Sequence, residues 1–195
     1  MPRFSENEKE QIRTKLLIEG ESLFSTFGLK KVTIDEITAA VNIAKATFYT
    51  FYDSKEALYL DIIQSTQAKI FAELDTLLSS NTNYNSKQRV KQVFAAMYQL
   101  MLQYPLLSQI NSNTITLISR KVDAPRLTTF VNQNIDAAHV LAKNGIAFTC
   151  TPEIASHVFQ ALYQGWLSLK DKETAVQEQV TDILLEGVID RILFD

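Results

Sequence analysis

Residues 33–58, TIDEITAAVNIAKATFYTFYDSKEAL, constrain the fold of this chain more than any other stretch. Thr33 and Glu36 form a capping box, the reciprocal pair of hydrogen bonds that begins a helix. After eight residues of helical pattern, Asn42 suits a turn position with positive φ. A second short helix over residues 44–51 follows, and then a long one. The stretch therefore predicts two short helices joined by a tight turn, which is the pattern of a helix-turn-helix.

The rest of the chain carries helical signals almost throughout. Only 5 of the 195 residues are glycine and 4 are proline, whereas 46% are hydrophobic and recur at helical spacing. Ser5 and Glu8 form another capping box, Gly28 suits the left-handed position after a helix end, and Asp53 or Ser54 caps the fourth helix. We therefore predict an all-α fold of about nine helices. Their expected bounds are 6–27, 34–41, 44–51, 54–78, 87–104, 106–119, 125–145, 152–170 and 174–195.

The chain is not strongly basic. Its formal net charge is -3, and residues 1–55 hold 8 of the 19 Lys and Arg and 8 of the 22 Asp and Glu residues, so the acidic excess lies in the remainder. A DNA interface on residues 1–55 would therefore depend on a few placed cations and be sensitive to salt. The single cysteine, Cys150, excludes an intrachain disulfide. With no signal-peptide pattern and no long apolar run, the sequence predicts a cytoplasmic protein without membrane association.

The second helix of the predicted helix-turn-helix has residue types that fit the major groove of DNA. Ala44 and Ala46 keep its tip slim, so that it can approach the base edges. Lys45 can donate to a guanine edge or a phosphate, and Thr47 can bond a phosphate or contact a thymine methyl group. Tyr49 can place its hydroxyl group on a phosphate. This helix is therefore the predicted recognition helix.

Residues on either side of the recognition helix add to the predicted interface. Thr33, by capping its helix, leaves its backbone amide free to face phosphate, and Lys55 lies in the first turn of the next helix, where the helix dipole attracts anions. Lys30 and Lys31 add positive charge, and Arg3 lies on an arm that can reach a minor groove. The simpler alternative is that these lysines are ordinary solvated side chains.

Several short motifs occur together in residues 12–60. They are Leu23, Phe24 and Gly28 near the end of the first helix, Thr33 and Ile37 in the second, VNIAKATFY at 41–49 and FYDSKEAL at 51–58. Together they resemble the tetracycline-repressor (TetR) family of bacterial transcriptional regulators, whose recognition helix reads approximately Ala-Gly-Val-Ser-x-Gly-Thr-Phe-Tyr and is followed by Tyr/His-Phe-x-Ser-Lys-Glu-x-Leu. The resemblance covers about a quarter of the chain. It implies a homodimer that binds DNA, with a ligand-binding and dimerising helical region after it.

The chain departs from this family pattern at three positions. Ala44 stands where the family usually has Ser, which removes a helix cap and a phosphate donor. Ala46 replaces a Gly, and Phe51 replaces a Tyr or His that can bond phosphate. These changes affect affinity and the choice of operator rather than the fold. Among the neighbouring aromatic residues, Phe48 and Tyr52 are expected in the core.

Apolar side chains with a few polar groups recur on the helices after residue 86. The resemblance implies a ligand cavity in this region, and aromatic and polar residues there are candidates for its lining. Each of them can equally be an ordinary core residue. The candidate ligand-binding residues are Phe94, Met97, Tyr98, Asn134, Tyr163 and Trp166.

The last two predicted helices, 152–170 and 174–195, are apolar on more than one face. One apolar stripe can face the core of the same chain. The remaining apolar surface predicts a four-helix interface between two copies, in which Gly165 and Gly187 allow close approach. The alternative is that both helices are wholly buried in a monomer.

No motif indicates catalysis. The chain has two His and one Cys, and no HExxH, GxSxG or Gly-rich phosphate loop, so we predict no enzyme, no metal and no cofactor. Residues 1–53 are expected to form the DNA-binding domain and residues 54–195 the ligand-binding and dimerisation domain. The predicted function is a ligand-responsive repressor that binds a palindromic double-stranded operator as a homodimer and is released by a small-molecule effector. The alternative is a helical small-molecule- or partner-binding protein of the same fold that has lost DNA binding.

Overall fold

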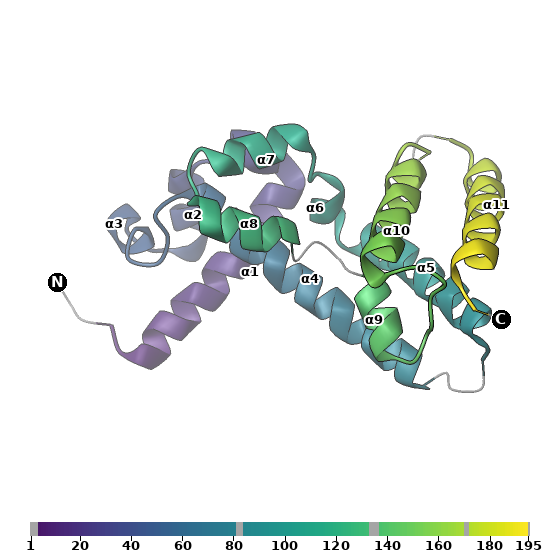
Figure 1. Ribbon diagram of the computed structural model, residues 1–195. Coiled ribbons are helices and arrows are strands. Elements are labelled where there is room, and N and C mark those ends of the chain that lie inside the picture. The colour runs from purple at the N-terminus through teal and green to yellow at the C-terminus, as the bar shows by residue number, and fades with distance from the viewer. Residues whose placement is uncertain (1–3, 81–83, 133–136, 170–171, 195) are drawn as a thin grey trace. The chain divides into compact units, whose positions relative to one another are not determined.

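The computed structural model describes residues 4–80, 84–132, 137–169 and 172–194, which are helical over most of their length (Figure 1). The all-α prediction is confirmed, since the extended pairing in these ranges is one isolated bridge between Phe148 and Leu193. None of the described helices combines the length and apolar character that a membrane span requires. The helices are α1 (Glu6–Lys31), α2 (Ile34–Val41), α3 (Lys45–Phe48), α4 (Lys55–Ser80), α5 (Ser86–Gln103), α6 (Pro105–Ser108), α7 (Ser112–Ser119), α8 (Ala124–Asn132), α9 (Ala137–Lys143), α10 (Pro152–Leu167) and α11 (Thr174–Ile192).

The chain divides into two compact units. The N-terminal unit is Met1–Ala68 with Gln103–Asn134, and the C-terminal unit is Lys69–Leu102 with Ile135–Asp195. Helix α4 begins in the first unit and ends in the second. These units are defined by packing, whereas the predicted boundary between residues 53 and 54 is a boundary of function and stays a prediction.

The N-terminal unit has a densely packed aromatic core. Helix α1 packs against α2 and α6, and it approaches α4 closely at Gly20, where a Cβ atom would lie 2.9 Å from Cδ1 of Ile62. Phe24 is fully buried and packs edge-to-face on Tyr59, with ring centroids 5.1 Å apart. Burial raises the pKa of Tyr59 to about 12. This core therefore packs α1 closely against the first part of α4.

The helix ends follow the local sequence signals. Both predicted capping boxes form, at the starts of α1 and α2. Ser54 Oγ accepts a hydrogen bond from the backbone N–H of Ala57 (3.1 Å), so Ser54 caps α4. Gly28 (φ 77°) and Asn42 (φ 58°) have the positive φ that the sequence predicts. Helix α1 resumes after the kink at Gly28 and ends at Lys31 rather than at residue 27.

One predicted helix is divided in two in the structure. Residues 106–119, expected as one helix, form α6 and α7, because Asn111 Oδ1 accepts a hydrogen bond from the backbone N–H of Thr114 (3.1 Å) and begins a new helix. Of the expected helix 125–145, the structure describes α8 and α9; residues 133–136 between them lie outside the described ranges, so the continuity of this helix stays a prediction. The described chain therefore contains eleven helices where the sequence predicted about nine.

In the C-terminal unit, α10 packs against both α9 and α11. Helices α5 and α11 are joined by two ion pairs. Lys87 Nζ lies 3.0 Å from Asp190 Oδ1, and Lys91 Nζ lies 2.7 Å from Glu186 Oε1. Because the residue numbers rise along α5 as they fall along α11, the two helices run in opposite directions.

Candidate nucleic-acid interface and ligand pocket

The helix-turn-helix is formed by α2 and α3, which pack against each other in the N-terminal unit. Phe48 is fully buried and Tyr52 is 5% exposed, which confirms both as core residues. Ala44 and Ala46 are exposed, and Tyr49 is 50% exposed. Helix α3 is four residues long, shorter than predicted, and it presents a slim tip with one phenol ring beside it.

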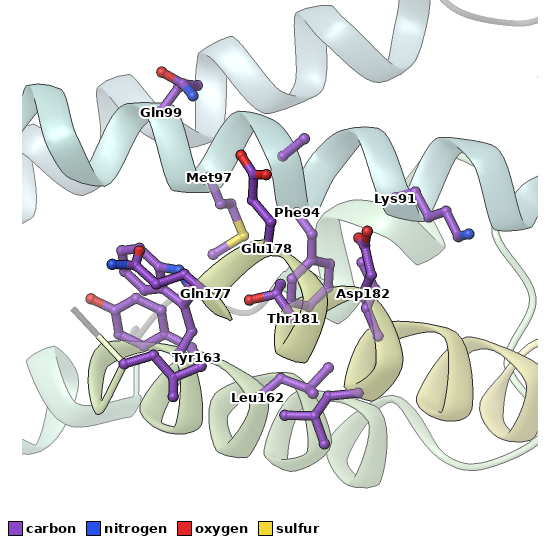
Figure 2. A pocket seen from close by; sticks show the side chains of 15 residues that line it. Lys91, Phe94, Met97, Gln99, Leu162, Tyr163, Gln177, Glu178, Thr181 and Asp182 are labelled. Carbon is purple, nitrogen blue, oxygen red and sulfur yellow. The ribbon is translucent and has the colours of Figure 1, made fainter. Parts of the chain in front are cut away.

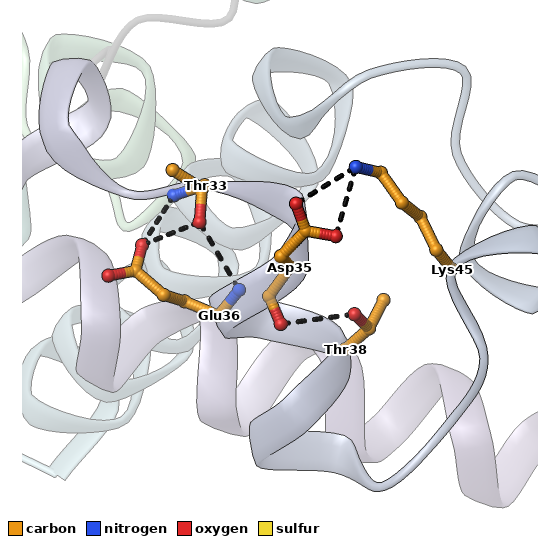
Figure 3. Close-up of polar contacts among 5 residues, drawn as sticks. All are labelled: Thr33, Asp35, Glu36, Thr38 and Lys45. Atoms are coloured by element: carbon orange, nitrogen blue, oxygen red, sulfur yellow. Dashed lines mark hydrogen bonds and ion pairs between the residues drawn. The ribbon is translucent and has the colours of Figure 1, made fainter.

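Lys45 is exposed at this tip and pairs with Asp35 in the first turn of α2 (Figure 3). Its Nζ lies 2.9 Å from the Asp35 carboxylate, and this hydrogen bond raises the pKa of Lys45 above its ordinary value. Exposed ion pairs of this kind are weak and are screened by salt. The side chain is therefore positioned at the tip and remains exchangeable. Thr47 lies half-buried two residues further on.

Thr33 makes the predicted cap, but its amide is not free. The backbone N–H of Thr33 donates to Glu36 Oε2 (2.7 Å), and Thr33 Oγ1 accepts from the backbone N–H of Glu36 (3.2 Å; Figure 3). The prediction of an amide free to face phosphate is therefore wrong, because the carboxylate of the capping box occupies it. The bonds from the Thr33 backbone and hydroxyl group hold the pKa of Glu36 below its ordinary value of 4.5.

Lys55 also bonds the backbone of its own chain. Its ammonium group donates to the carbonyl oxygens of Leu29 (2.7 Å), Lys30 (3.3 Å) and Val32. An ammonium group has three N–H donors, so all of them are used at the end of α1. Lys55 thereby ties the start of α4 to the end of α1, and its contact with DNA stays a prediction. Arg3, predicted on the N-terminal arm, lies outside the described residues.

A surface hollow of about 390 Å³ brings the predicted residues together with one that the sequence did not single out. Thr33, Lys45, Tyr49 and Lys55 line it, and so does the exposed Lys121 in the turn after α7. Lys121 lies far from the helix-turn-helix in sequence, so no local motif marks it. Only the packing of the N-terminal unit brings this lysine to the same surface.

A pocket of about 460 Å³ lies between α5, α10 and α11 of the C-terminal unit (Figure 2). Four of the six predicted ligand-binding residues line it, namely Phe94, Met97, Tyr163 and Trp166. Asn134 and the side chain of Tyr98 lie outside the described part of the chain, so these two stay predictions. The residues predicted from helical periodicity thus include four that line one pocket, although they come from two helices far apart in the chain.

The pocket has an aromatic side and a polar side. On α10, the rings of Tyr163 and Trp166 stack with centroids 6.1 Å apart and 26° between their planes. Burial raises the pKa of Tyr163 to about 12. None of the residues on the polar side was among the predicted ligand contacts, although acidic residues at every fourth position of residues 174–195 are a signal for it. Helix α11 supplies Gln177, Glu178, Thr181 and Asp182.

Helices α10 and α11 also carry apolar side chains that the described chain leaves exposed. Ile154 on α10 is 52% exposed, and Ile183 on α11 is 64% exposed. A Cβ atom built at Gly165 or Gly187 would meet no atom within 4 Å. Both glycines therefore face open space, and the wholly buried alternative does not hold for Ile154 and Ile183.

An exposed recognition tip in one unit and a ligand-sized pocket in the other define a class, the helix-turn-helix regulator with a separate effector-binding unit. Residues 16–62 match the family model of bacterial regulatory proteins, tetR family. This match spans α2, α3 and the start of α4, with most of α1. Residues 16–62 of this chain are therefore a DNA-binding domain of the tetR-family type.

Relatives of the chain agree with this assignment. The chain is 23% identical over 158 residues to the uncharacterized HTH-type transcriptional regulator YhgD of Bacillus subtilis, covering 77% of this chain and 80% of YhgD. It is 27% identical over 93 residues to IcaR of Staphylococcus aureus, the negative transcriptional regulator of the biofilm operon icaADBC, covering 48% of this chain and 45% of IcaR. The prediction that the chain is not an enzyme is confirmed at the level of this family of regulators.

The fold has close counterparts among solved structures. The reduced form of Escherichia coli NemR superposes with a TM-score of 0.66 over 93% of this chain and 97% of NemR, at 22% identity. At this level of identity the likeness concerns the fold alone.

Proposed function

We propose that the protein is a repressor that binds a palindromic DNA operator as a homodimer and leaves it when a small molecule enters the C-terminal pocket. The exposed tip of α3, inside a domain that matches the tetR family, carries this proposal. The relative IcaR is a negative transcriptional regulator, which supports a repressor rather than an activator. Because bacterial operators lie in the cytoplasm, the protein acts there. Residues 1–53 supply most of the DNA contacts, and residues 54–195 bind the ligand and dimerise.

The proposed contacts divide into one that reads sequence and several that position the protein. Lys45 exchanges Asp35 for a base edge, and the two small residues beside it allow the approach. Tyr49 and Thr47 bond backbone phosphates, which gives affinity without sequence preference. Lys121 adds a phosphate contact from outside the helix-turn-helix, because it lines the same hollow as Lys45 and Tyr49.

The proposed dimer forms through α10 and α11. The exposed Ile154 and Ile183 supply apolar contact area, and the open space at Gly165 and Gly187 lets helices of a second copy approach closely. Two recognition helices then enter successive major grooves about 34 Å apart. An effector that binds more tightly to a dimer whose recognition helices have another spacing releases the operator. The loss of operator affinity is set by the difference between the effector's affinities for the two dimer conformations.

The test uses the full chain and an operator selected from random duplexes. Tyr49→Ala should weaken binding about tenfold for every sequence, because it removes a phosphate contact from each half-site, whereas Lys45→Ala should chiefly relax discrimination at one base position. Tyr84→Ala is the control for Tyr49→Ala, since Tyr84 is 44% exposed in the C-terminal unit. Lys143→Ala is the control for Lys45→Ala, since Lys143 also pairs with an exposed aspartate, Asp75. Undiminished binding by both Tyr49→Ala and Lys45→Ala contradicts the assignment.

A second candidate is a small-molecule- or partner-binding protein that has lost DNA binding. The neutral charge of residues 1–55 and the alanines at 44 and 46 favour it. A mobility-shift assay at low salt separates the two, because even non-specific DNA binding appears there. In a salt titration, Lys121→Ala should reduce the slope of log affinity against log salt by about one per subunit. No shift at any salt concentration favours the second candidate.

A further inference from the structure

Acidic residues recur at every fourth position along α11, and lysines occur at the same spacing on α5. Lys87 pairs with Asp190 at 3.0 Å, and Lys91 pairs with Glu186 at 2.7 Å. Since the helices run in opposite directions, these positions form a series of facing pairs, which we call the ladder. Each advance of four residues along α5 faces a retreat of four residues along α11. The acidic positions of the ladder are Glu178, Asp182, Glu186 and Asp190.

The ladder loses its lysines where the pocket opens. The next two positions on α5 are Ala95 and Gln99, and they correspond to Asp182 and Glu178 on α11. All four residues line the pocket. Within the described ranges, the structure gives neither of these two carboxylates an ion pair. Lys91 is already engaged, because its ammonium group bonds Glu186.

The rest of the pocket is suited to an apolar body. Phe94 and Met97 of α5 and the stacked Tyr163 and Trp166 of α10 line the same space (Figure 2). Aromatic faces attract cations as well as apolar groups, since the face of the ring is its negative side. The acidic edge and the aromatic side therefore favour the same sign of charge.

Resting on the function proposed above, we propose that this pocket binds an organic cation with an aromatic or bulky apolar body. Its positive charge lies next to Glu178 and Asp182. It takes the place of the lysines that α5 lacks at positions 95 and 99. Its apolar body packs on Phe94, Tyr163 and Trp166.

Other occupants fit the lining less well. A bare metal ion is disfavoured, because no group of three His, Cys, Asp or Glu side chains is placed for it in the part of the chain that is described. An anion would meet two carboxylates, while the lysine at the pocket rim is paired with Glu186. A second copy of the chain that covers the pocket is an outcome of the test below.

The test compares two probes of the same shape and opposite charge, tetraphenylphosphonium and tetraphenylborate, on the full chain. Trp166 is the single tryptophan of the sequence and lines the pocket, so its fluorescence reports occupancy. Isothermal titration calorimetry supplies an independent dissociation constant. Saturable binding of tetraphenylphosphonium at about 1–100 µM is expected, with the borate at least about tenfold weaker.

Two charge-matched variants locate the effect. Glu178→Gln with Asp182→Asn should weaken tetraphenylphosphonium binding about tenfold and reduce the preference over the borate. Glu73→Gln with Glu153→Gln changes the net charge equally at exposed positions outside the pocket lining and leaves the Lys91–Glu186 pair intact, so it should change binding less than about twofold. All four side chains are exposed, and a far-UV circular dichroism melt confirms that both variants fold.

Each outcome decides the proposal. Equal or tighter borate binding, no saturable phosphonium binding, or an equal effect of the two double variants overturns it. If Glu178→Gln with Asp182→Asn alters dimerisation and leaves phosphonium binding unchanged, a second copy covers the pocket, and the proposal is wrong. Operator binding, measured on the same samples, keeps the questions separate. In the unchanged chain, absence of phosphonium binding with intact operator binding refutes the ligand class alone, whereas phosphonium binding without operator binding refutes the regulator.

Discussion

The recognition surface and the pocket are built in opposite ways. Apart from Lys121, the recognition surface comes from one stretch, residues 33–55, whose turns and caps are made by residues three or four apart. The pocket is assembled from residues 91–99, 162–169 and 177–185, which meet only when three helices pack. When a site is made from residues close together in sequence, its chemistry can be predicted from the sequence. When a site is made from distant helices, its charge pattern depends on how those helices pack.

The two regions also differ in packing. The core beneath the recognition surface contains fully buried aromatic side chains, whereas Phe94, Tyr163 and Trp166 around the pocket are only half-buried. Close packing resists change, because every lost methyl group leaves a cavity. A pocket that admits a ligand instead leaves part of its lining solvated. Stability should therefore depend mainly on the first region and ligand response on the second.

The largest expected effect tests this difference in packing. Phe24→Ala should lower the free energy of unfolding by about 3–5 kcal/mol, because Phe24 is fully buried against Tyr59. Trp166→Ala should lower the free energy of unfolding by less than half as much, because its ring already borders open space. The same substitution should abolish the binding of tetraphenylphosphonium in the pocket. Urea unfolding followed by far-UV circular dichroism measures both. Equal costs would mean that Trp166 belongs to a closed core.

A smaller effect is expected at the turn of the helix-turn-helix. Asn42 has φ 58° and ψ 50°, a conformation that costs most non-glycine residues about 1–2 kcal/mol. Asn42→Ala should therefore lower the free energy of unfolding by about 1 kcal/mol and weaken operator binding. Asn42→Gly is the control, and its stability should stay close to that of the original chain. An unchanged Asn42→Ala variant would show that tertiary packing, not local geometry, determines the turn.

The smallest effect concerns the capping box of α2. Because hydrogen bonds from Thr33 lower the pKa of Glu36 in the folded chain, its ionised form contributes stability above pH 4.5, and this contribution is lost as the pH falls through the lowered pKa. Glu36→Gln should therefore be less stable than the original chain at neutral pH, and the difference should vanish in acid. In a Thr33→Ala background the same substitution should have less effect at neutral pH. A difference independent of pH would exclude the capping carboxylate as its cause.

Local signals predicted the helix-turn-helix well, but they did not predict the acceptors of the Thr33 amide, which bonds Glu36 three residues on, or of the Lys55 ammonium group. The capping boxes, Asn42 and the core position of Phe48 depend on the intrinsic preferences of a few adjacent residues. The Lys55 ammonium group, by contrast, bonds carbonyl groups more than twenty residues earlier. No sequence pattern specifies which acceptor lies within reach of a long, flexible side chain.

The order of helices, their caps, the slim lysine-bearing tip and the resemblance to a regulator family were determined by the amino-acid sequence, because each depends on spacing along the chain. The pairing of α5 with α11, and with it the two carboxylates at the pocket edge, was decided only by the tertiary structure. The physical reason is that electrostatic pairing acts through space, so its partners are known only after the helices have packed.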